Sequence, residues 1–216
     1  MKNIGVISIT KNSMPSINSK LGSINNLSVK NYLDEGIHQM IKNENGVTNK
    51  SIMRMAQIIE KASQDGADII LLTCTVFTPK IDILQSLFDL PILAIDDPMM
   101  ENAAIINKKT AILCTFKASI KTSEDVFIKH STAHKFGNKP DMFLLSDALL
   151  EIEKGNKEIH DKIIAEKVYE LSDRYEVIIL AQLSMTDSLK LLQKTDAIVL
   201  NSLDSICEKI DGIVNE

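Results

Sequence analysis

The side chain best suited to chemistry is the thiol of Cys74, which stands between the hydroxyls of Thr73 and Thr75 in the stretch "ADIILLTCTVFTP". The apolar run before it predicts a buried strand, and Thr78-Pro79 after it predicts the start of a helix. Positive partial charge at a helix start favours the thiolate, so Cys74 fits an acid–base or nucleophilic role. The alternative is a small residue that fills the core, because free cysteines are often buried.

Polar residues follow the other predicted strands at corresponding places. The carboxyl ends of parallel strands meet at one edge of a sheet, so these residues are expected to line a ligand site. Short hydroxyls, amides and backbone N–H groups suit the binding of carboxylate oxygens, although Ser, Thr and Asp also serve as helix caps and turn residues. The candidates besides Cys74 are Ser8, Thr10, Thr73, Thr75, Asp96, Asp97, Thr115, Ser119, Gln182, Ser184, Met185, Asn201 and Ser202.

The elements that position these residues follow an α/β pattern. Short β-branched or leucine-rich runs alternate with stretches of helical period, which predicts parallel strands covered by helices on both faces. The predicted strands are 4–9, 68–73, 91–95, 110–114, 141–145, 176–181 and 197–200, with a weaker one near 27–32.

The helix predicted over residues 49–64 is the most regular, because an apolar stripe follows Thr48 as N-cap and the helix stops before Gly66. A second helix is predicted from Thr78-Pro79 to about Phe88. Two more, 146–154 and 157–172, are expected on either side of Gly155-Asn156. The Asn- and Ser-rich segment 11–31 is predicted to be mostly surface loop.

The chain also contains an internal repeat. "IGVIS" from Ile4 matches "AILCT" from Ala111, "IILLTC" ending at Cys74 matches "VIILAQ" ending at Gln182, and "ILAID" from Ile92 matches "IVLNS" from Ile198. Because the three pairs are almost equally spaced, we predict two pseudo-symmetric α/β lobes, with a ligand cleft between their strand ends. The predicted lobes are residues 1–97 with about 200–216, and residues 98–199.

Composition narrows the classes of protein. A net charge of −5 and only 4% aromatic residues argue against a nucleic-acid partner. No apolar run reaches about 18 residues and the N-terminus has no cleavage-site pattern, so we expect a cytoplasmic protein without a membrane partner. The phosphate-binding patterns GxGxxG and GxxxxGK are absent, so no nucleotide cofactor is expected.

Cysteine and histidine spacing gives no sign of a metal site or a disulfide. The three cysteines are far apart in the chain, and the histidines fall in polar surroundings where surface positions are expected. Two of the thiols are predicted to be core residues, one in a strand and one in a helix. The residues concerned are Cys114 and Cys207, and His38, His130, His134 and His160.

With these residues in place, the chain resembles the aspartate/glutamate/hydantoin racemase superfamily. The resemblance rests on "IGVISIT", "ADIILLTCT", "LPILAIDD", "TAILCTFKAS", "IEKGNKEIHDKIIAEKVYEL" and "VIILAQLSM", which span nearly the whole chain in the expected order. It implies two pseudo-symmetric lobes, a site that works without a cofactor, and a homodimer. It also implies a catalytic cysteine from each lobe, one on either face of the substrate.

Only the first of these two cysteines is present, since Cys74 matches it and Gln182 takes the place of the second. The chain therefore resembles a subgroup with this substitution. Glutamine cannot act as a general acid or base, so Gln182 is expected to orient the substrate. Cys114 is predicted to lie on the wrong strand to replace the missing thiol.

The resulting expectation is an isomerase of a small carboxylate, with Cys74 as its single catalytic thiol and an enolate-like or cysteine-adduct intermediate. Ser8, Thr10, Thr73, Thr75, Thr115, Ser119, Ser184 and Met185 are the expected substrate-binding residues. A decarboxylase of a malonate-like acid, or a binding protein that has lost catalysis, remain alternatives.

Overall fold

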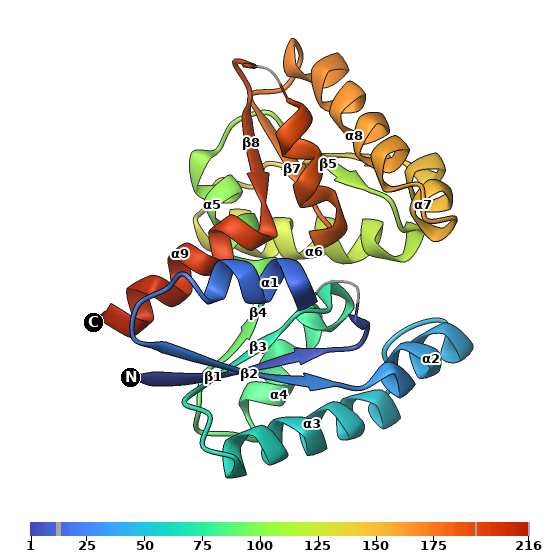
Figure 1. Cartoon of the computed structure of the whole chain (residues 1–216). Coiled ribbons are helices and arrows are strands. Elements are labelled where there is room, and N and C mark those ends of the chain that lie inside the picture. The colour runs from blue at the N-terminus through green and yellow to red at the C-terminus, as the bar shows by residue number, and fades with distance from the viewer. Residues whose placement is uncertain (12–13, 193, 216) are drawn as a thin grey trace. The chain divides into compact units, whose positions relative to one another are not determined.

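Two four-stranded parallel sheets form the framework of the protein, as a computed structural model shows (Figure 1). The structure describes residues 1–11, 14–192 and 194–215. The chain divides into a first unit, Met1–Ile95 with Ile206–Glu216, and a second unit, Asp96–Ser205. The chain thus leaves the first unit after its fourth strand and returns to it within the last helix.

The first unit has the strand order β2-β1-β3-β4. All of its strand pairs are parallel, and helices or 3₁₀ turns connect the strands. Its elements are β1 (Lys2–Ser8), α1 (Met14–Leu21), β2 (Leu27–Leu33), α2 (Glu35–Glu44), α3 (Asn49–Gln64), β3 (Ile69–Leu72), η2 (Thr75–Lys80), α4 (Ile81–Gln85) and β4 (Ile92–Ala94), to which most of α9 (Ser202–Asn215) is added.

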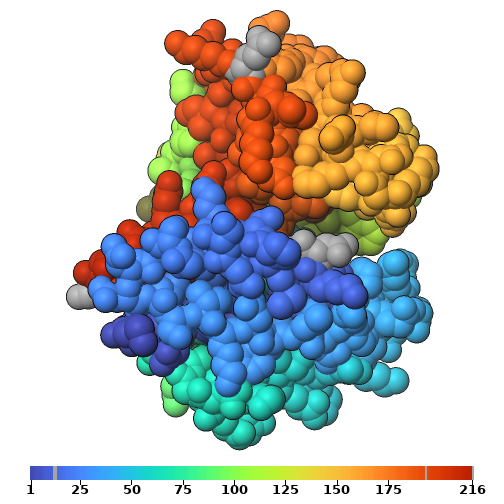
Figure 2. All heavy atoms as spheres, viewed as in Figure 1, coloured from blue at the N-terminus to red at the C-terminus, as the bar shows by residue number. Residues whose placement is uncertain are grey.

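The second unit repeats this arrangement with the order β6-β5-β7-β8, again all parallel. Its elements are α5 (Asp97–Ile106), β5 (Thr110–Cys114), α6 (Lys117–Ala133), β6 (Asp141–Leu144), α7 (Ser146–Glu153), α8 (Lys157–Ser172), β7 (Val177–Leu180), η3 (Leu183–Leu191) and β8 (Ile198–Asn201). The α7–α8 pair lies at the surface of this unit, in yellow and orange (Figure 2).

The two middle strands of each sheet are buried along most of their length, because helices cover both sheet faces. In the first unit Ile7, Ile70 and Leu72 pack with the apolar stripe of α3. In the second unit alternate strand residues enter two cores, one containing α5 and α6 residues and one containing α7 and α8 residues. The side-chain alternation of a strand accounts for this division.

The matching strand orders confirm the predicted fold class of two similar parallel α/β lobes. In each unit a 3₁₀ helix follows the strand that ends near one of the two main candidate residues. In the first unit η2 follows β3 near Cys74, and in the second unit η3 follows β7 near Gln182. The shared features support a duplicated ancestral unit. A ligand cleft between the lobes stays a prediction.

Two local predictions are wrong. The helix expected at Thr78-Pro79 begins at Thr75 as a 3₁₀ helix and becomes α-helical at Ile81, because the Phe77 N–H already bonds the Cys74 carbonyl at 3.0 Å. The segment predicted as mostly loop contains α1, whose buried side chains are only Ile17 and Leu21. Residues 12 and 13 lie outside the described part of the chain.

Other local predictions are confirmed. The α3 helix spans residues 49–64 as expected, and the Thr48 N–H bonds the Ser51 hydroxyl at 2.9 Å. The break between α7 and α8 falls at Gly155, whose φ of +85° favours glycine. Among the described residues no helix has both the length and the apolar character needed to span a bilayer.

Candidate functional site

In the first unit, the polar residues after β1 and β3 lie side by side. The Thr73 hydroxyl donates to the Ser8 hydroxyl at 3.1 Å, and the Thr73 N–H bonds the Ile7 carbonyl at 3.1 Å. Ser8 is fully buried, whereas Thr73, Thr75 and Thr10 are partly exposed. The hydrogen bond fixes the position from which the next residue, Cys74, projects.

Cys74 lies at the boundary between the core and the solvent. Its side chain is partly exposed and packs against the apolar cluster around Phe77. Its backbone is extended and forms the N-cap position of η2. The thiol is therefore supported by packing and still accessible, which suits a reactive group and does not suit a residue that only fills the core.

In the second unit, the equivalent strand ends are joined through Gln182. The Gln182 Oε1 accepts the Thr115 backbone N–H at 2.8 Å and lies 3.4 Å from the Thr115 hydroxyl. Thr115 is only 3% exposed, so its N–H has little access to solvent. Gln182 thus makes the β5–β7 link that Thr73 and Ser8 make between β1 and β3.

The amide nitrogen of Gln182 is the unusual atom of this arrangement. Because Oε1 is bound to Thr115, the orientation of the side-chain amide is set. Nε2 is buried and has no hydrogen-bond partner among the described residues. A buried donor without a partner is costly, so this atom is suited to donate to an acceptor on a ligand.

Cys114 lies near Gln182. It ends β5, the strand that pairs directly with β7, and it is fully buried. Burial raises the pKa of the thiol to about 11, with the Asp96 carboxylate adding to the rise, while the Ser123 hydroxyl and the nearby Gln182 amide, whose Nε2 lies outside hydrogen-bond geometry with the sulfur, act to lower it. The thiol therefore stays protonated near neutral pH and is not poised to act as a base there.

The raised pKa of Cys114 predicts a loss of stability at high pH. The unfolded chain releases the thiol proton from about pH 9, whereas the folded chain holds it to about pH 11. The stabilisation is therefore complete below pH 9 and is lost as pH rises to 11, by on the order of 2 to 3 kcal/mol. Urea unfolding across this range is expected to show a steeper decline for the wild type than for Cys114→Ala. If stability declines with pH equally in the two proteins, the pKa of Cys114 is not raised in the folded state.

The remaining candidates have varied surroundings. Ser119 and Met185 are buried, Met185 within an apolar core, while Ser184 is exposed. Asn201 caps α9, since its side-chain oxygen accepts the Asp204 N–H at 2.9 Å. The structure thus gives Met185 and Asn201 structural contacts, and a substrate-binding role for Met185 stays a prediction.

The two carboxylates after β4 and the last strand-end hydroxyl also differ in their surroundings. Asp96 is fully buried, and Asp97 pairs with His130 at 2.9 Å between α5 and α6. Ser202 is buried and its hydroxyl has no hydrogen-bond partner in the described chain. Among the described residues no cluster of three or more His, Cys, Asp and Glu could hold a metal ion.

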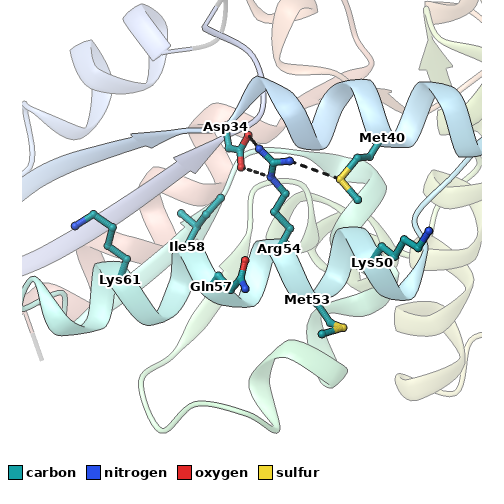
Figure 3. Close-up of a pocket in the computed structure, with 8 residues that line it drawn as sticks. All are labelled: Asp34, Met40, Lys50, Met53, Arg54, Gln57, Ile58 and Lys61. Carbon is teal, nitrogen blue, oxygen red and sulfur yellow. Dashed lines mark hydrogen bonds and ion pairs between the residues drawn. The ribbon is translucent and has the colours of Figure 1, made fainter.

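A surface groove of the first unit, between α2 and α3, is lined by none of these candidate residues (Figure 3). Arg54 reaches from α3 to Asp34 at the end of β2, with nitrogen–oxygen distances of 2.6 and 2.8 Å. A methyl group on Gly36 would lie 2.4 Å from the guanidinium, so glycine makes room for this ion pair. The pair ties β2 to α3, which is a structural role. The lining residues are Asp34, Met40, Lys50, Met53, Arg54, Gln57, Ile58 and Lys61.

Sequence reasoning missed a charged network in the second unit. His160 was expected at the surface but is fully buried, and its Nδ1 lies 2.8 Å from an Asp161 oxygen. The spacing of His160 with Ile164 and Val168 already places it on the apolar stripe of α8. This helical spacing indicates burial of His160 more strongly than its polar sequence neighbours indicate exposure.

Comparison with known proteins identifies the family. A family model described as Asp/Glu/Hydantoin racemase matches residues 5–209, nearly the whole chain. The chain belongs to this racemase family. Among curated proteins, none matches its sequence.

Solved racemase structures share the fold of this family member. An aspartate racemase from Picrophilus torridus has a TM-score of 0.74 at 12% identity, covering 100% of this chain and 95% of the other. An allantoin racemase from Klebsiella pneumoniae has a TM-score of 0.72 at 13% identity, covering 100% and 88%. A glutamate racemase isoform from Bacillus anthracis has a TM-score of 0.70 at 13% identity, covering 99% and 82%. Identities this low establish a common fold and no particular substrate.

Proposed function

We propose that this racemase-family protein is a cofactor-independent enzyme that exchanges the α-proton of a small carboxylate, with Cys74 as its single catalytic thiol. The observation that carries the proposal is the position of Cys74, partly exposed at the end of β3 and supported by the Thr73–Ser8 hydrogen bond. Membership of the racemase family supports the reaction type. The names of the similar structures, all racemases, support it further.

The proposed chemistry acts on a proton next to a carboxylate. The Cys74 thiolate takes the α-proton and becomes a thiol, while the electron pair of the C–H bond moves into an enolate-like intermediate. Hydroxyls of Thr75, Thr115, Ser119 and Ser184 are proposed to bind the carboxylate oxygens. The Gln182 Nε2 is proposed to donate to the same ligand, because it has no partner in the described protein.

A single acid–base group predicts exchange without inversion. Since Cys74 removes and returns the proton on one face, the α-proton of one enantiomer is expected to exchange with solvent while its configuration is kept. The test incubates both enantiomers of aspartate and of glutamate separately with the protein in D₂O, and follows the α-proton signal by NMR and the configuration by chiral chromatography. Exchange with retention, at least about tenfold faster than inversion, is the expected result.

Rapid inversion of a substrate by the wild type would contradict the single-thiol mechanism, since a second acid–base group would then be at work. Absence of exchange with every compound would count against α-proton chemistry on these substrates. In that case the racemase-family fold and the Gln182 Nε2, which has no hydrogen-bond partner among the described residues, favour a function other than chemistry on these compounds.

Two alternatives follow from the expectation that Gln182 takes the place of a second catalytic thiol. Decarboxylation of a malonate-like acid needs one proton donor, which Cys74 can supply, and it is detected as CO₂ release from a substituted malonate. A binding protein needs no acid–base group at all. Small carboxylates would then raise the melting temperature while the Cys74 thiol stays unreactive towards alkylating agents.

A further inference from the structure

The segment that follows Gln182 has an unusual conformation that requires support. The η3 segment is a 3₁₀ helix of nine residues, whereas 3₁₀ runs beyond three or four residues are uncommon because their hydrogen bonds are poorly aligned. Gln182 is the N-cap residue of η3, and its carbonyl accepts the Met185 N–H at 3.0 Å. Whatever holds η3 therefore also holds the backbone of Gln182.

Contacts with α8 supply that support. Lys157, in the first turn of α8, places its ammonium nitrogen 2.7 Å from Asp161 on the same helix and 2.9 Å from Asp187 on η3. The second oxygen of Asp187 binds Lys190 at 2.7 Å. Lys157 is thus the cation that bridges the two elements.

The far end of this network is anchored in the core. Asp161 has 11% of its side chain exposed, and its other oxygen lies 2.8 Å from Nδ1 of the fully buried His160. Burial lowers the pKa of Lys157, but hydrogen bonds to Asp161 and Asp187 outweigh it, so the net pKa is raised. The pKa of Asp187 is lowered by Lys190 and Lys157. A network with a buried anchor holds its geometry better than an isolated surface pair.

We propose that Lys157 is a positioning residue, which fixes η3 against α8 and thereby holds the Gln182 amide in its bond with Thr115. The structural part of this inference concerns the second unit alone. Its catalytic consequence rests on the proposed function, in which Gln182 orients the substrate.

The test uses the Thr115 backbone amide as a reporter, because its N–H donates to Gln182 Oε1. The nearby Ala181 N–H, which bonds the Leu113 carbonyl at 3.0 Å, is the internal reference for the sheet itself. Hydrogen exchange of both amides is measured by NMR in the full-length protein. Lys157→Met is expected to speed exchange at Thr115 by about tenfold and to leave Ala181 nearly unchanged.

Matched variants separate positioning from a general loss of stability. Lys157→Arg keeps the charge and is expected to restore Thr115 protection to within about threefold of the wild type. Lys162→Met removes a lysine from the same helix whose side chain is 71% exposed and lies 3.8 Å from Glu166, and it is expected to change neither amide. Asp187→Asn breaks the bridge from the η3 side and is expected to reproduce the Thr115 effect if Lys157→Met folds poorly.

Equal acceleration at Thr115 and Ala181, or no change at Thr115 in both Lys157→Met and Asp187→Asn, would overturn the inference. These outcomes do not depend on any substrate. Where a substrate exchanges its α-proton, Lys157→Met is expected to raise KM more than it lowers kcat, since Cys74 is untouched. Failure of the proposed function therefore shows in the wild-type exchange assay, and failure of this inference shows in the amide reporter.

Discussion

Replacement of Cys74 by serine is expected to lower the rate of α-proton exchange by about a thousandfold or more. A positioned acid–base group contributes roughly 10²- to 10⁴-fold to a rate, and a serine hydroxyl does not ionise near neutral pH. The fold should be kept, because the two side chains are similar in size and Cys74 lies at the edge of its apolar cluster. Exchange of the α-proton in D₂O, measured at equal concentrations of folded protein, gives the comparison.

Cys207→Ser is the matched control, since Cys207 is the other partly exposed thiol of the described chain and lies on α9. It is expected to keep the wild-type rate and the wild-type melting temperature. Full activity of Cys74→Ser would end the case for Cys74 as the acid–base group. An equal loss in both variants would point to a general effect of removing thiols.

The fold was predictable where local signals agreed with tertiary contacts. The α3 helix follows from its stripe and its cap, and the strands follow from apolar runs that helices bury on both faces. The α1 helix was missed because only Ile17 and Leu21 are buried among polar neighbours, which leaves a weak periodic signal. The start of η2 was missed because Thr-Pro marks a helix start strongly, whereas a 3₁₀ turn has no comparable sequence signal.

For the candidate site, the sequence predicts which polar residues follow the strands, but it does not predict the contacts that these residues make. Cys74 and Gln182 are candidates because they follow equivalent strands of the internal repeat. The bond from Thr115 to Gln182 depends on side-chain orientation, and the Lys157–Asp187 bridge joins residues of separate elements, so neither leaves a pattern in the sequence. Cys114 lies on β5 and Gln182 follows β7, so the two are on different strands as predicted, but β5 and β7 are neighbours in the sheet. Strand order is set by the whole topology, which spacing alone does not reveal.

Gln182→Cys is expected to convert exchange with retention into racemisation, with an inversion rate at least about tenfold above that of the wild type. The reason is that the family resemblance implies a thiol at this position as the second acid–base group, and glutamine cannot serve. Inversion should be fastest where one thiol is ionised and the other is protonated, because one removes the α-proton and the other returns a proton on the opposite face. The inversion rate, measured from about pH 6 to pH 10, is therefore expected to rise and then fall.

Gln182→Ser is the control, because it also removes the bond from Oε1 to the Thr115 N–H but adds no group that ionises in this pH range. It is expected to show no inversion, together with weaker ligand binding from the lost Nε2 donor. If both variants gain inversion equally, the effect comes from loosening the β5–β7 link and owes nothing to a second thiol. Gln182→Cys could also gain no inversion although alkylation shows that its thiol ionises. In that case the reaction does not require an acid–base group from the second unit. The one-sided chemistry of Cys74 then favours decarboxylation over racemisation.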